Sequence, residues 1–383
     1  MKIIGYYIFA LFYYAFRLFC PIKTKKVFAI MTHDSSKDGN VGYLVEYLKK
    51  KEEGYTFEYL KKSDRNLAKS FHLLKGKVSF FIWKPFHLAT AEYVLLDNVF
   101  LPMAYLKFRG KVKVIQLWHG TGTIKKFGQD VNTGTLKILE KKANSRITHL
   151  IVNSEETREI YGGAFGVARD KVYCYGLPRT DLFFDPRKIR ERKQKFYERY
   201  PNLVGKTLVL YAPTFRDREK DHPSIALDLE LLSQELPEQY VFMLRLHPFV
   251  MEAFQHDAQP LDDKEKDTNI VSMSDYPDIS TLLLVADYLI TDYSSSIFEY
   301  CLRERPMIFH AYDLEEFEHN ARGFYRPYRE YVPGPIARDT GELIALLKQN
   351  QFDFKQIQMF KDKNYQYQDG NSTERLYLHI FQS

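Results

Sequence analysis

The stretch that decides the fold is YLITDYSSSIFEY, residues 288–300. Its first four residues are apolar or β-branched, a polar segment follows, and an apolar run that favours a helix comes next. In a parallel α/β sheet a buried strand leads through a polar loop into a helix, and ligands bind beyond the carboxyl ends of the strands. The stretch therefore predicts one strand-loop-helix unit, with residues 292–296 at the ligand-binding edge.

Runs of the same kind recur along the chain. We predict buried parallel strands at 26–31, 77–82, 93–96, 113–117, 149–152 and 171–175, and again at 207–211, 240–245, 269–272, 288–291 and 307–310. A charged segment at 187–200 favours a helix, and Pro201 to Lys206 interrupts it before the next strand. With 383 residues, two α/β domains are the natural expectation.

The composition limits the classes of function. Lys+Arg 55 against Asp+Glu 49 give a net charge of +6, which suits a phosphate-bearing substrate or an anionic membrane. The bias is too mild to indicate nucleic-acid binding. Cys20, Cys174 and Cys301 are far apart and show no CxxC spacing, which argues against a disulfide framework and a structural zinc site. We expect a reduced cytoplasmic protein without metal or cofactor.

The N-terminal segment is short, apolar and aromatic. No charged residue occurs from Ile3 to Phe16, and Arg17 and the basic stretch Lys23 to Lys26 follow. The run is shorter than the about 20 apolar residues that span a bilayer, and it lacks the small-residue cleavage site of a signal peptide. We predict a helix at the membrane surface whose rings insert and whose lysines attract anionic headgroups. The alternative is a hydrophobic helix docked on the protein core or on a partner.

The segment WHGTGTIKK, residues 118–126, follows the predicted strand 113–117. His119 is a titratable imidazole beside glycines that let a ligand approach the backbone. A neutral histidine can take a proton from a hydroxyl group, while amides and lysines favour phosphate oxygens. The pattern predicts acceptor activation, and the alternative is a turn with a structural histidine. The expected substrate-binding residues here are Gly120, Thr121, Gly122, Thr123 and Lys125.

Cationic side chains end two predicted strands of the second half. In RLHP, residues 245–248, strand alternation points Arg245 and His247 to the same face, where they could hold a diphosphate. Without other evidence, Arg245 and His247 could equally form salt bridges at the end of a strand. In YAPTFR, residues 211–216, Thr214 precedes Arg216, whose guanidinium suits bidentate phosphate contact.

The polar segment after residues 288–291 could bind an anion through amides at a helix N-terminus. Its candidate residues are Asp292, Ser294, Ser295 and Ser296, with Glu299 one turn into the helix. A carboxylate at 299 can accept hydrogen bonds from ribose or glycerol hydroxyls. The alternative is an ordinary helix cap in which Glu299 completes a capping box. The sequence contains no P-loop, no GxGxxG and no cluster at metal-ligand spacing.

Four motifs occur in this order: WHGTGTIKKFG from Trp118, YAPTFR from Tyr211, RLHP from Arg245 and TDYSSSIFE from Thr291. Together they resemble the CDP-glycerol glycerophosphotransferases over about residues 115 to 375, including DGNS at 369–372. The ordered combination is far more specific than any single motif. The resemblance implies a GT-B-like α/β fold, with two Rossmann-like doubly wound domains, a cleft between them and metal-independent phosphotransfer.

The resemblance also implies roles for single residues. It makes His119 the general base and His247, with Arg245, the group that binds the diphosphate. The remaining contacts to the donor would come from Arg179 in GLPR at 176–179, Arg216, Ser294, Ser295 and Glu299.

One departure from the family pattern bears on the reaction. Polymerising members read HGTPLK where this chain has HGTGTIK at 119–125, and we expect the chain to lack their extra N-terminal domain. Both features resemble the primase, which transfers one glycerol phosphate from CDP-glycerol to N-acetylmannosaminyl-N-acetylglucosamine undecaprenyl diphosphate and releases CMP. The alternatives are a short transferase that extends a primed linker, a glycosyltransferase that uses a nucleotide sugar, and a scaffold for wall-synthesis partners.

The expected organisation has three parts. They are an interfacial helix at 1–24, an acceptor domain at 25–203 and a CDP-glycerol-binding domain at 204–383, whose last helix can pack back on the acceptor domain. The expected location is the cytoplasmic face of the cell membrane, with an anionic lipid surface as partner.

Overall fold

The computed structural model describes residues 2–33, 37–51, 54–64, 74–214, 216, 225–246, 250, 269–320 and 322–382. By its internal contacts the chain divides into two compact units. The first unit holds 1–121, 126–184 and 364–383, and the second holds 122–125 and 185–363. The boundary predicted from the sequence lies after residue 203, whereas the contacts group residues 185–203 with the second unit.

The first unit is built on six strands. These are β1 (Lys23–Met31), β2 (Thr56–Lys61), β3 (Ala91–Leu96), β4 (Lys113–Gln116), β5 (His149–Ile151) and β6 (Val172–Tyr173). Its helices are α1 (Lys2–Phe19), α2 (Asn40–Lys51), α4 (Leu74–Val78), α5 (Lys84–Ala89), α6 (Gly134–Asn144), α7 (Glu155–Phe165) and α17 (Ser372–Leu376). Short helical turns complete it: η1 (Ser79–Trp83), η2 (Leu101–Tyr105), η3 (Gly128–Asp130), η4 (Arg169–Lys171), η5 (Pro178–Phe184) and η9 (Tyr377–Phe381).

The second unit also has six strands. These are β7 (Thr207–Tyr211), β8 (Tyr240–Leu244), β9 (Ile270–Ser272), β10 (Tyr288–Thr291), β11 (Met307–His310) and β12 (Ile336–Ala337). Its helices are α8 (Pro186–Arg199), α9 (Leu229–Glu235), α11 (Ile279–Val285), α12 (Ser296–Tyr300), α13 (Leu314–Asn320), α14 (Tyr328–Tyr331), α15 (Thr340–Gln349) and α16 (Phe354–Asn364). The turns η6 (Pro201–Leu203) and η8 (Cys301–Arg303) follow α8 and α12.

Both sheets are parallel and doubly wound. The strand order is β2-β1-β3-β4-β5-β6 in the first unit and β12-β11-β10-β7-β8-β9 in the second, and every strand pair is parallel. In each sheet, successive strands are added first toward one edge and then toward the other. The loops at the carboxyl ends of the strands diverge where this direction changes, and ligands of doubly wound folds bind at such a point. The two parallel-sheet α/β domains expected from the sequence are confirmed.

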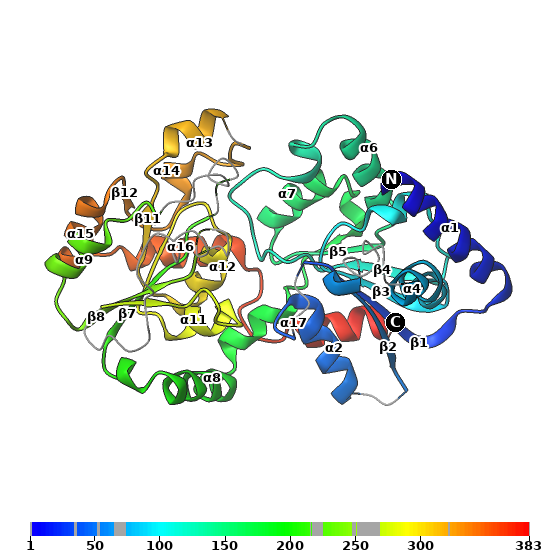
Figure 1. Cartoon of the computed structure of the whole chain (residues 1–383), viewed down its shortest axis with the longest axis horizontal. Helices are drawn as coiled ribbons and strands as arrows, with labels where there is room; N and C mark the ends of the chain where they lie inside the picture. The colour runs from blue at the N-terminus through cyan, green and yellow to red at the C-terminus, as the bar shows by residue number, and fades with distance from the viewer. Residues whose placement is uncertain are drawn as a thin grey trace. The chain divides into compact units, whose positions relative to one another are not determined.

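The alternation of β1 explains how one sheet supports two cores. Phe28 and Ile30 point into a core that includes α1, α6 and α7, while Val27 and Ala29 point into a core that includes α2 and α17. Successive side chains of a strand face opposite sides, so a strand covered by helices on both faces must be apolar throughout. Figure 1 shows α6 and α7 on one side of this sheet and α2 and α17 on the other.

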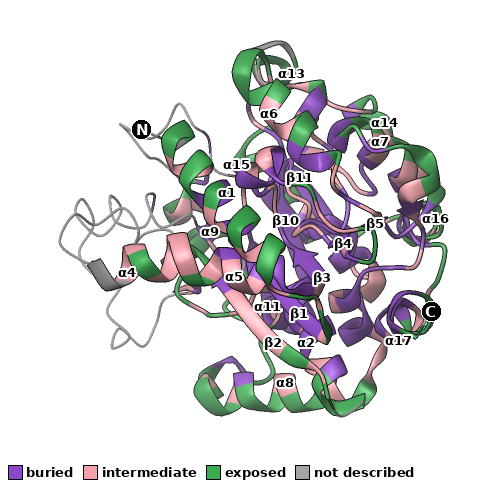
Figure 2. Ribbon diagram, turned by 90° about the vertical axis from the view of Figure 1, so that its right-hand side faces the viewer, coloured by how far each residue is buried: buried purple, intermediate pink, exposed green. Residues whose placement is uncertain are grey.

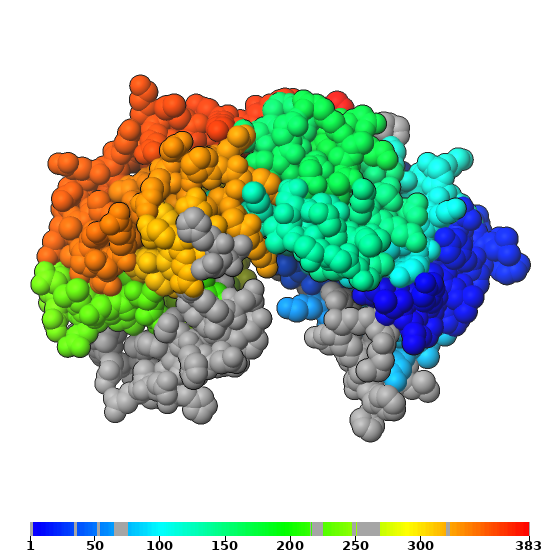
Figure 3. Space-filling view, turned by 90° about the horizontal axis from the view of Figure 1, so that it is seen from above, coloured from blue at the N-terminus to red at the C-terminus, as the bar shows by residue number. Residues whose placement is uncertain are grey.

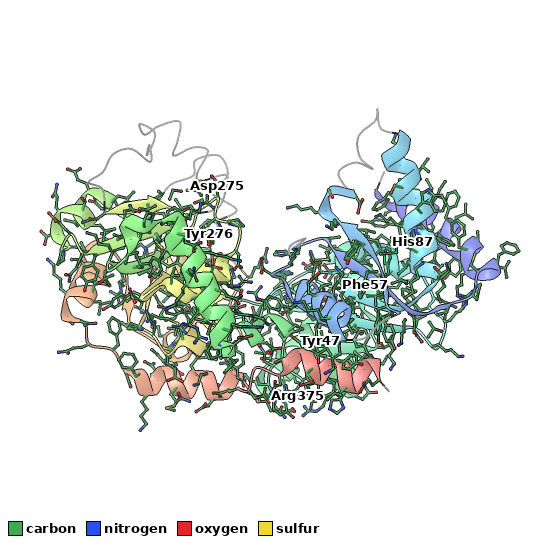
Figure 4. All side chains as sticks on the ribbon, turned by 90° about the horizontal axis from the view of Figure 1, so that it is seen from below. Tyr47, Phe57, His87, Asp275, Tyr276 and Arg375 are labelled. Carbon is green, nitrogen blue, oxygen red and sulfur yellow. The ribbon has the colours of Figure 1, made fainter. Side chains whose placement is uncertain are left out.

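The carboxyl-terminal helix belongs to the first unit. Asp181 in η5 accepts hydrogen bonds from the backbone amides of Ser372 and Thr373, at 2.9 and 2.8 Å, and so caps α17. Figure 4 shows Tyr47 on α2 and Arg375 on the adjacent α17. The DGNS motif at 369–372 is therefore the start of a helix that completes the fold of the first unit.

One predicted strand is wrong. Residues 77–82 form the end of α4 and most of η1, and the strand beside β1 is instead β2 at Thr56–Lys61. The apolar run is helical because its rings pack against the first helix, with Phe80 5.7 Å from Phe9 between ring centroids. Tertiary packing here overrides the strand-like composition.

The first helix has one buried and one exposed face. Phe9 and Tyr13 are 0% and 2% exposed, and the phenol of Tyr13 donates to the carbonyl of Lys107 at 3.2 Å. The opposite face carries exposed apolar side chains: Ile3, Ile4, Tyr7, Ile8, Leu11, Tyr14, Leu18 and Phe19. Figure 2 shows this outer face as exposed, and Figure 3 shows the helix in dark blue at the surface. Within the described part of the chain, no helix has the length and apolar character needed to cross a bilayer.

The prediction of an interfacial helix whose rings insert, followed by lysines drawn to anionic headgroups, needs two corrections. Phe9 cannot insert into lipid because it lies in the core of the first unit. Lys26 is 4% exposed, and its ammonium donates to the hydroxyl of Thr90 at 2.7 Å. Docking on the core, the alternative considered for this helix, describes its buried face.

Candidate active site

His119 lies in the loop that follows β4 in the first unit, at the carboxyl edge of the sheet. Its ring nitrogen Nδ1 is 3.0 Å from the backbone carbonyl oxygen of Asp97, which follows β3. A carbonyl oxygen can only accept, so Nδ1 carries the proton of the neutral ring. The lone pair of the neutral imidazole is therefore on Nε2, which is the atom able to act as a base.

The backbone that presents His119 is held in an unusual conformation. Trp118 has a φ angle of 54°, in the left-handed region that residues other than glycine rarely adopt. The amide of Asn40 on α2 donates to the carbonyl of Trp118 at 3.1 Å, and the amide nitrogen of Trp118 donates to Gln116 at 2.9 Å. Strain of this kind persists only where the surroundings fix it, and it is common at functional sites.

The environment of His119 keeps its ring neutral. Burial, the nearby ring of His33 and the guanidinium of Arg179 lower the pKa of His119 to about 3, while the hydrogen bond to Asp97 opposes the shift. Removing water disfavours the charged form of an imidazole, and like charges act in the same direction. His119 is therefore unprotonated throughout the neutral pH range.

Arg179 also lies at this site. Its guanidinium donates to the carbonyl of His119 at 3.0 Å, and its backbone amide donates to the side-chain oxygen of Asn40 at 3.2 Å. Arg179, which the resemblance assigned to the donor pocket, contacts the HGTG segment within the first unit, and its role toward the donor stays a prediction. The arginine holds the loop through a carbonyl and places a positive charge next to the ring of His119.

The next residues of the loop are held by buried polar side chains. Tyr161 donates to the carbonyl of Gly120 at 3.0 Å, and Asn153 donates to that of Thr121 at 2.9 Å.

Residues 122–125 are counted with the second unit, where the ammonium of Lys125 lies 3.4 Å from the hydroxyl of Thr214. A Cβ atom at position 122 would lie 2.4 Å from the ring of Phe298, so only glycine fits there.

In the second unit, the predicted residues after β7 and β10 meet at the carboxyl edge. Asp292 accepts a hydrogen bond from the backbone amide of Thr214 at 2.8 Å and forms an ion pair with Arg216 at 2.8 Å. The two strands pair directly. The side chain of Asp292 is 1% exposed and that of Arg216 is 4% exposed, so this ion pair is buried.

Arg216 has a second carboxylate partner that sequence reasoning missed. Its guanidinium donates two bonds of 2.9 Å to Asp313, and Tyr293 donates to the same carboxylate at 2.9 Å. Burial disfavours the cation, but the bonds to Asp313 and the charge of Asp292 outweigh it and raise the pKa of Arg216. Protein carboxylates bind this guanidinium in the structure, and the predicted contact of Arg216 with phosphate stays a prediction.

The serines and Glu299 lie where the motif placed them. Ser294 and Ser295 follow β10, and Ser296 begins α12, where its amide donates to the hydroxyl of Ser294 at 3.2 Å. Glu299 is 0% exposed, on α12. This arrangement is compatible with both a nucleotide contact and the alternative of a local cap.

Arg245 directly follows β8, and its side chain contacts the loop after β9. One terminal nitrogen donates to the carbonyls of Met273, at 2.7 Å, and Tyr276, at 2.6 Å, and Ser274 is a third acceptor. Tyr276 is labelled in Figure 4. His247 lies outside the described residues, so its predicted role with Arg245 stays a prediction.

Several residues of the site were missed from the sequence. Asp97 and His33 follow β3 and β1, and both reach His119. The rule that ligand-binding residues follow the carboxyl ends of strands would have indicated them, because 93–96 and 26–31 were predicted as strands. Asn153 and Asp313 follow the predicted strands 149–152 and 307–310 in the same way, whereas Asn40 on α2 has no such signal and reaches the loop only in the folded chain.

Two parallel-sheet α/β units, with a neutral imidazole at one strand end and a buried Arg-Asp pair at another, define a GT-B-like transferase architecture. The family model for CDP-glycerol:poly(glycerophosphate) glycerophosphotransferase matches residues 12–382. The chain belongs to this family, as the four ordered motifs predicted.

Named relatives act on teichoic acid. The chain is 35% identical to a teichoic acid poly(ribitol-phosphate) polymerase of Bacillus spizizenii, over 96% of this chain and 58% of the relative. It is 34% identical to a teichoic acid glycerol-phosphate primase of Bacillus subtilis, over 76% of each. The chain spans 53 to 58% of the length of three ribitol-phosphate polymerases that it matches.

The fold is shared with a solved relative. A structure of the wall teichoic acid polymerase TagF aligns with a TM-score of 0.80 and 26% identity, over 98% of this chain and 93% of that chain. A TagF structure soaked with CDPG aligns with a TM-score of 0.79 and 25% identity, over the same shares. The chain therefore shares its fold with a solved wall teichoic acid polymerase.

Proposed function

We propose that the protein transfers one glycerol phosphate from CDP-glycerol to N-acetylmannosaminyl-N-acetylglucosamine undecaprenyl diphosphate and releases CMP. The observation that carries the proposal is the Nδ1 contact of His119 with the Asp97 carbonyl. It leaves Nε2 as the basic atom, as an enzyme that activates a sugar hydroxyl requires. Family membership supports a CDP-alcohol as the donor.

The reaction follows from this base. Nε2 of His119 takes the proton of the acceptor hydroxyl as its oxygen attacks the glycerol-side phosphorus. A new P–O bond forms, the bridging P–O bond to CMP breaks, and its electron pair leaves with CMP. The negative phosphates of the bound donor favour the imidazolium, so the pKa of His119 rises from its low value as the substrate arrives. That rise brings the base closer to the pH at which it must accept a proton.

The second unit is proposed to hold the donor. Ser294, Ser295, Ser296 and Glu299 are the candidates for contacts with CDP-glycerol, because they follow β10 at the carboxyl edge of the sheet. Arg216 and Asp292 support this edge from inside, since their ion pair ties the loop after β7 to the loop after β10. Positioned groups of this kind lower a phosphoryl-transfer barrier by orientation and charge.

A second candidate donor is CDP-ribitol. The poly(ribitol-phosphate) polymerase of Bacillus spizizenii aligns over 96% of this chain, a larger share than the 76% covered by the glycerol-phosphate primase. The chemistry at phosphorus is the same for both donors, so His119 would serve either one. Extension of a primed linker remains the alternative to priming.

The proposed location is the membrane surface, as a peripheral protein. The acceptor's undecaprenyl tail stays in the bilayer because each buried methylene is worth about 0.8 kcal/mol. The exposed face of α1 places Ile4, Leu11 and Leu18 at the surface, with 64%, 68% and 76% exposure. Apolar side chains on one face of a helix suit insertion into the headgroup region, and the exposed Lys23 suits an anionic surface.

Product mass tests the function directly. The protein is incubated with the lipid-linked disaccharide and, in separate reactions, CDP-glycerol, CDP-ribitol and a nucleotide sugar. Addition of a single glycerol phosphate with one CMP released per product supports priming. Multiple additions indicate a polymerase, ribitol phosphate in the product indicates the second donor, and transfer from the nucleotide sugar alone would overturn the proposal.

A further inference from the structure

The ring of His33 lies flat against the ring of His119. The two centroids are 3.5 Å apart and the planes differ by 5°. His33 follows β1 and His119 follows β4, so the contact joins two loops at one edge of the first sheet. The His33 side chain is exposed to solvent on its other parts.

The same pair is tied together by Asp97. Its carboxylate accepts the backbone amides of Thr32, at 2.9 Å, and of His33, at 3.2 Å, while its carbonyl accepts the ring proton of His119. One buried residue thus fixes the loop that carries His33 and the tautomer of His119. The stack and the hydrogen bond act on different atoms of the His119 ring.

We propose that His33 is a positioning residue for His119, whose stacked ring fixes the plane of the base so that Nε2 keeps one direction. One hydrogen bond at Nδ1 does not by itself fix the plane of the ring, and a flat aromatic neighbour limits its tilt. The inference rests on the proposed role of His119 as the base. It deepens that role by assigning His33, whose position no motif of the chain had indicated.

The stack also affects protonation. The groups that face His119 are His33 from the β1 loop, Asp97 from the β3 loop, Arg179 from η5 and Trp118 from its own loop, with ring centroids 4.0 Å apart in the last case. His33 shields one face of the ring from water, and a charge on His33 would repel a proton on His119. Both effects favour the neutral base before substrate binds.

The test compares His33→Ala with His33→Phe. Alanine removes the stacked face, whereas phenylalanine keeps a flat ring of similar size without a titratable group. We expect His33→Ala to lower kcat by about 10-fold to 100-fold, the scale of a misplaced catalytic group, with little change in KM for the donor. We also expect the acid limb of kcat/KM to move to higher pH, because His119 becomes easier to protonate. His33→Phe should retain most of the parent kcat.

The matched control is His379→Ala. His379 is exposed, belongs to the first unit and stacks on Tyr175 at 4.9 Å and 12°, so it shares with His33 the exposure and the stacked ring but lies away from His119 in η9. The control should keep the parent kcat and pH profile. Parent kcat and an unchanged acid limb in His33→Ala would overturn the inference, and so would a change in KM alone, which would make His33 a substrate contact.

A measurement without turnover separates this inference from the proposed function. The ring signals of His119, followed by NMR against pH in labelled protein, should show a higher pKa in His33→Ala than in the parent. If no donor is used by the parent protein, the function fails while this shift still supports positioning. If His119→Ala is inactive but His33→Ala leaves both the pKa and kcat unchanged, the positioning role fails alone. Should His33→Ala not fold, as judged by circular dichroism, His33→Phe and His33→Gln provide the same comparison.

Discussion

The carboxylate of Asp292 lies 2.8 Å from the guanidinium of Arg216, and both side chains are almost completely buried. Each follows a central strand of the second sheet, so their ion pair connects the ends of β10 and β7. Asp313 completes the arrangement by binding the same guanidinium with two further bonds. The buried Arg216 guanidinium between two carboxylates therefore stabilises this edge of the sheet, and we expect its removal to lower the stability of the protein.

Arg216→Ala should destabilise the protein. Removing one partner of a buried ion pair leaves an uncompensated charge and typically costs about 3 to 5 kcal/mol. Chemical denaturation measures the change in the free energy of unfolding. The control is Arg329→Ala, which breaks an exposed pair with Glu315, with 50% and 73% exposure, and should cost about 0 to 1 kcal/mol. Full stability of Arg216→Ala with only weaker donor binding would instead show the phosphate contact expected from the sequence.

His119→Ala should abolish transfer while leaving donor binding nearly unchanged. A general base acts mainly in the transition state, and its loss typically costs roughly 100-fold to 10,000-fold in rate. Steady-state rates with the lipid-linked acceptor, together with calorimetric donor binding, measure the two effects. A variant that turns over at the parent rate would show that another group removes the proton.

The pH dependence should differ between kcat/KM and kcat. Neutral His119 is the active form, and the pKa of the free protein's His119 is lowered to about 3 by burial and by His33. Activity through this group is therefore lost only as pH falls toward that value, well below the ordinary histidine range. The negative phosphates of bound donor raise the pKa, so the acid limb of kcat should lie at higher pH than that of kcat/KM. An acid limb of kcat/KM at the ordinary histidine value would contradict the buried environment.

Activity should survive a chelator. Within the residues that the structure describes, no group of three or more His, Cys, Asp or Glu side chains is placed to hold a metal ion. The phosphate charge would then be balanced by protein cations and amides. Transfer is measured after treatment with EDTA and again after divalent ions are restored. A strict requirement for the added ion would count against this mechanism.

The two faces of α1 should respond differently to the same chemical change. Leu11→Asp with Leu18→Asp alters residues with 68% and 76% exposure, so it should weaken vesicle binding and leave the fold intact. Phe9→Asp alters a residue with 0% exposure and should destabilise the first unit by at least the ~3 to 5 kcal/mol of a buried Phe→Ala change. Vesicle co-sedimentation and thermal unfolding measure the two outcomes. Unchanged co-sedimentation of the leucine double variant would move membrane contact to another surface.

The sequence by itself determined the architecture and the position of the proposed base, His119. Buried parallel strands are continuous apolar runs, so those at 207–211, 288–291 and 307–310 could be located to the residue. The strand-end rule then placed His119, Asp292 and Arg216 at the functional edges, because chain direction alone decides which end of a strand is the carboxyl end. The order of four motifs identified the family.

Only the tertiary structure decided what these residues contact. The prediction of a strand at 77–82 was wrong because an apolar run is compatible with a helix as well as with a strand. Packing of this segment against α1 favours the helix. An arginine that suits phosphate also suits carboxylate, so the sequence could not show that Asp313 occupies Arg216. His33 lies 86 positions before His119 in the chain and meets it only because β1 and β4 end at the same edge of one sheet. Side-chain partners of this kind are set by the folded arrangement of distant loops, which local pattern does not encode.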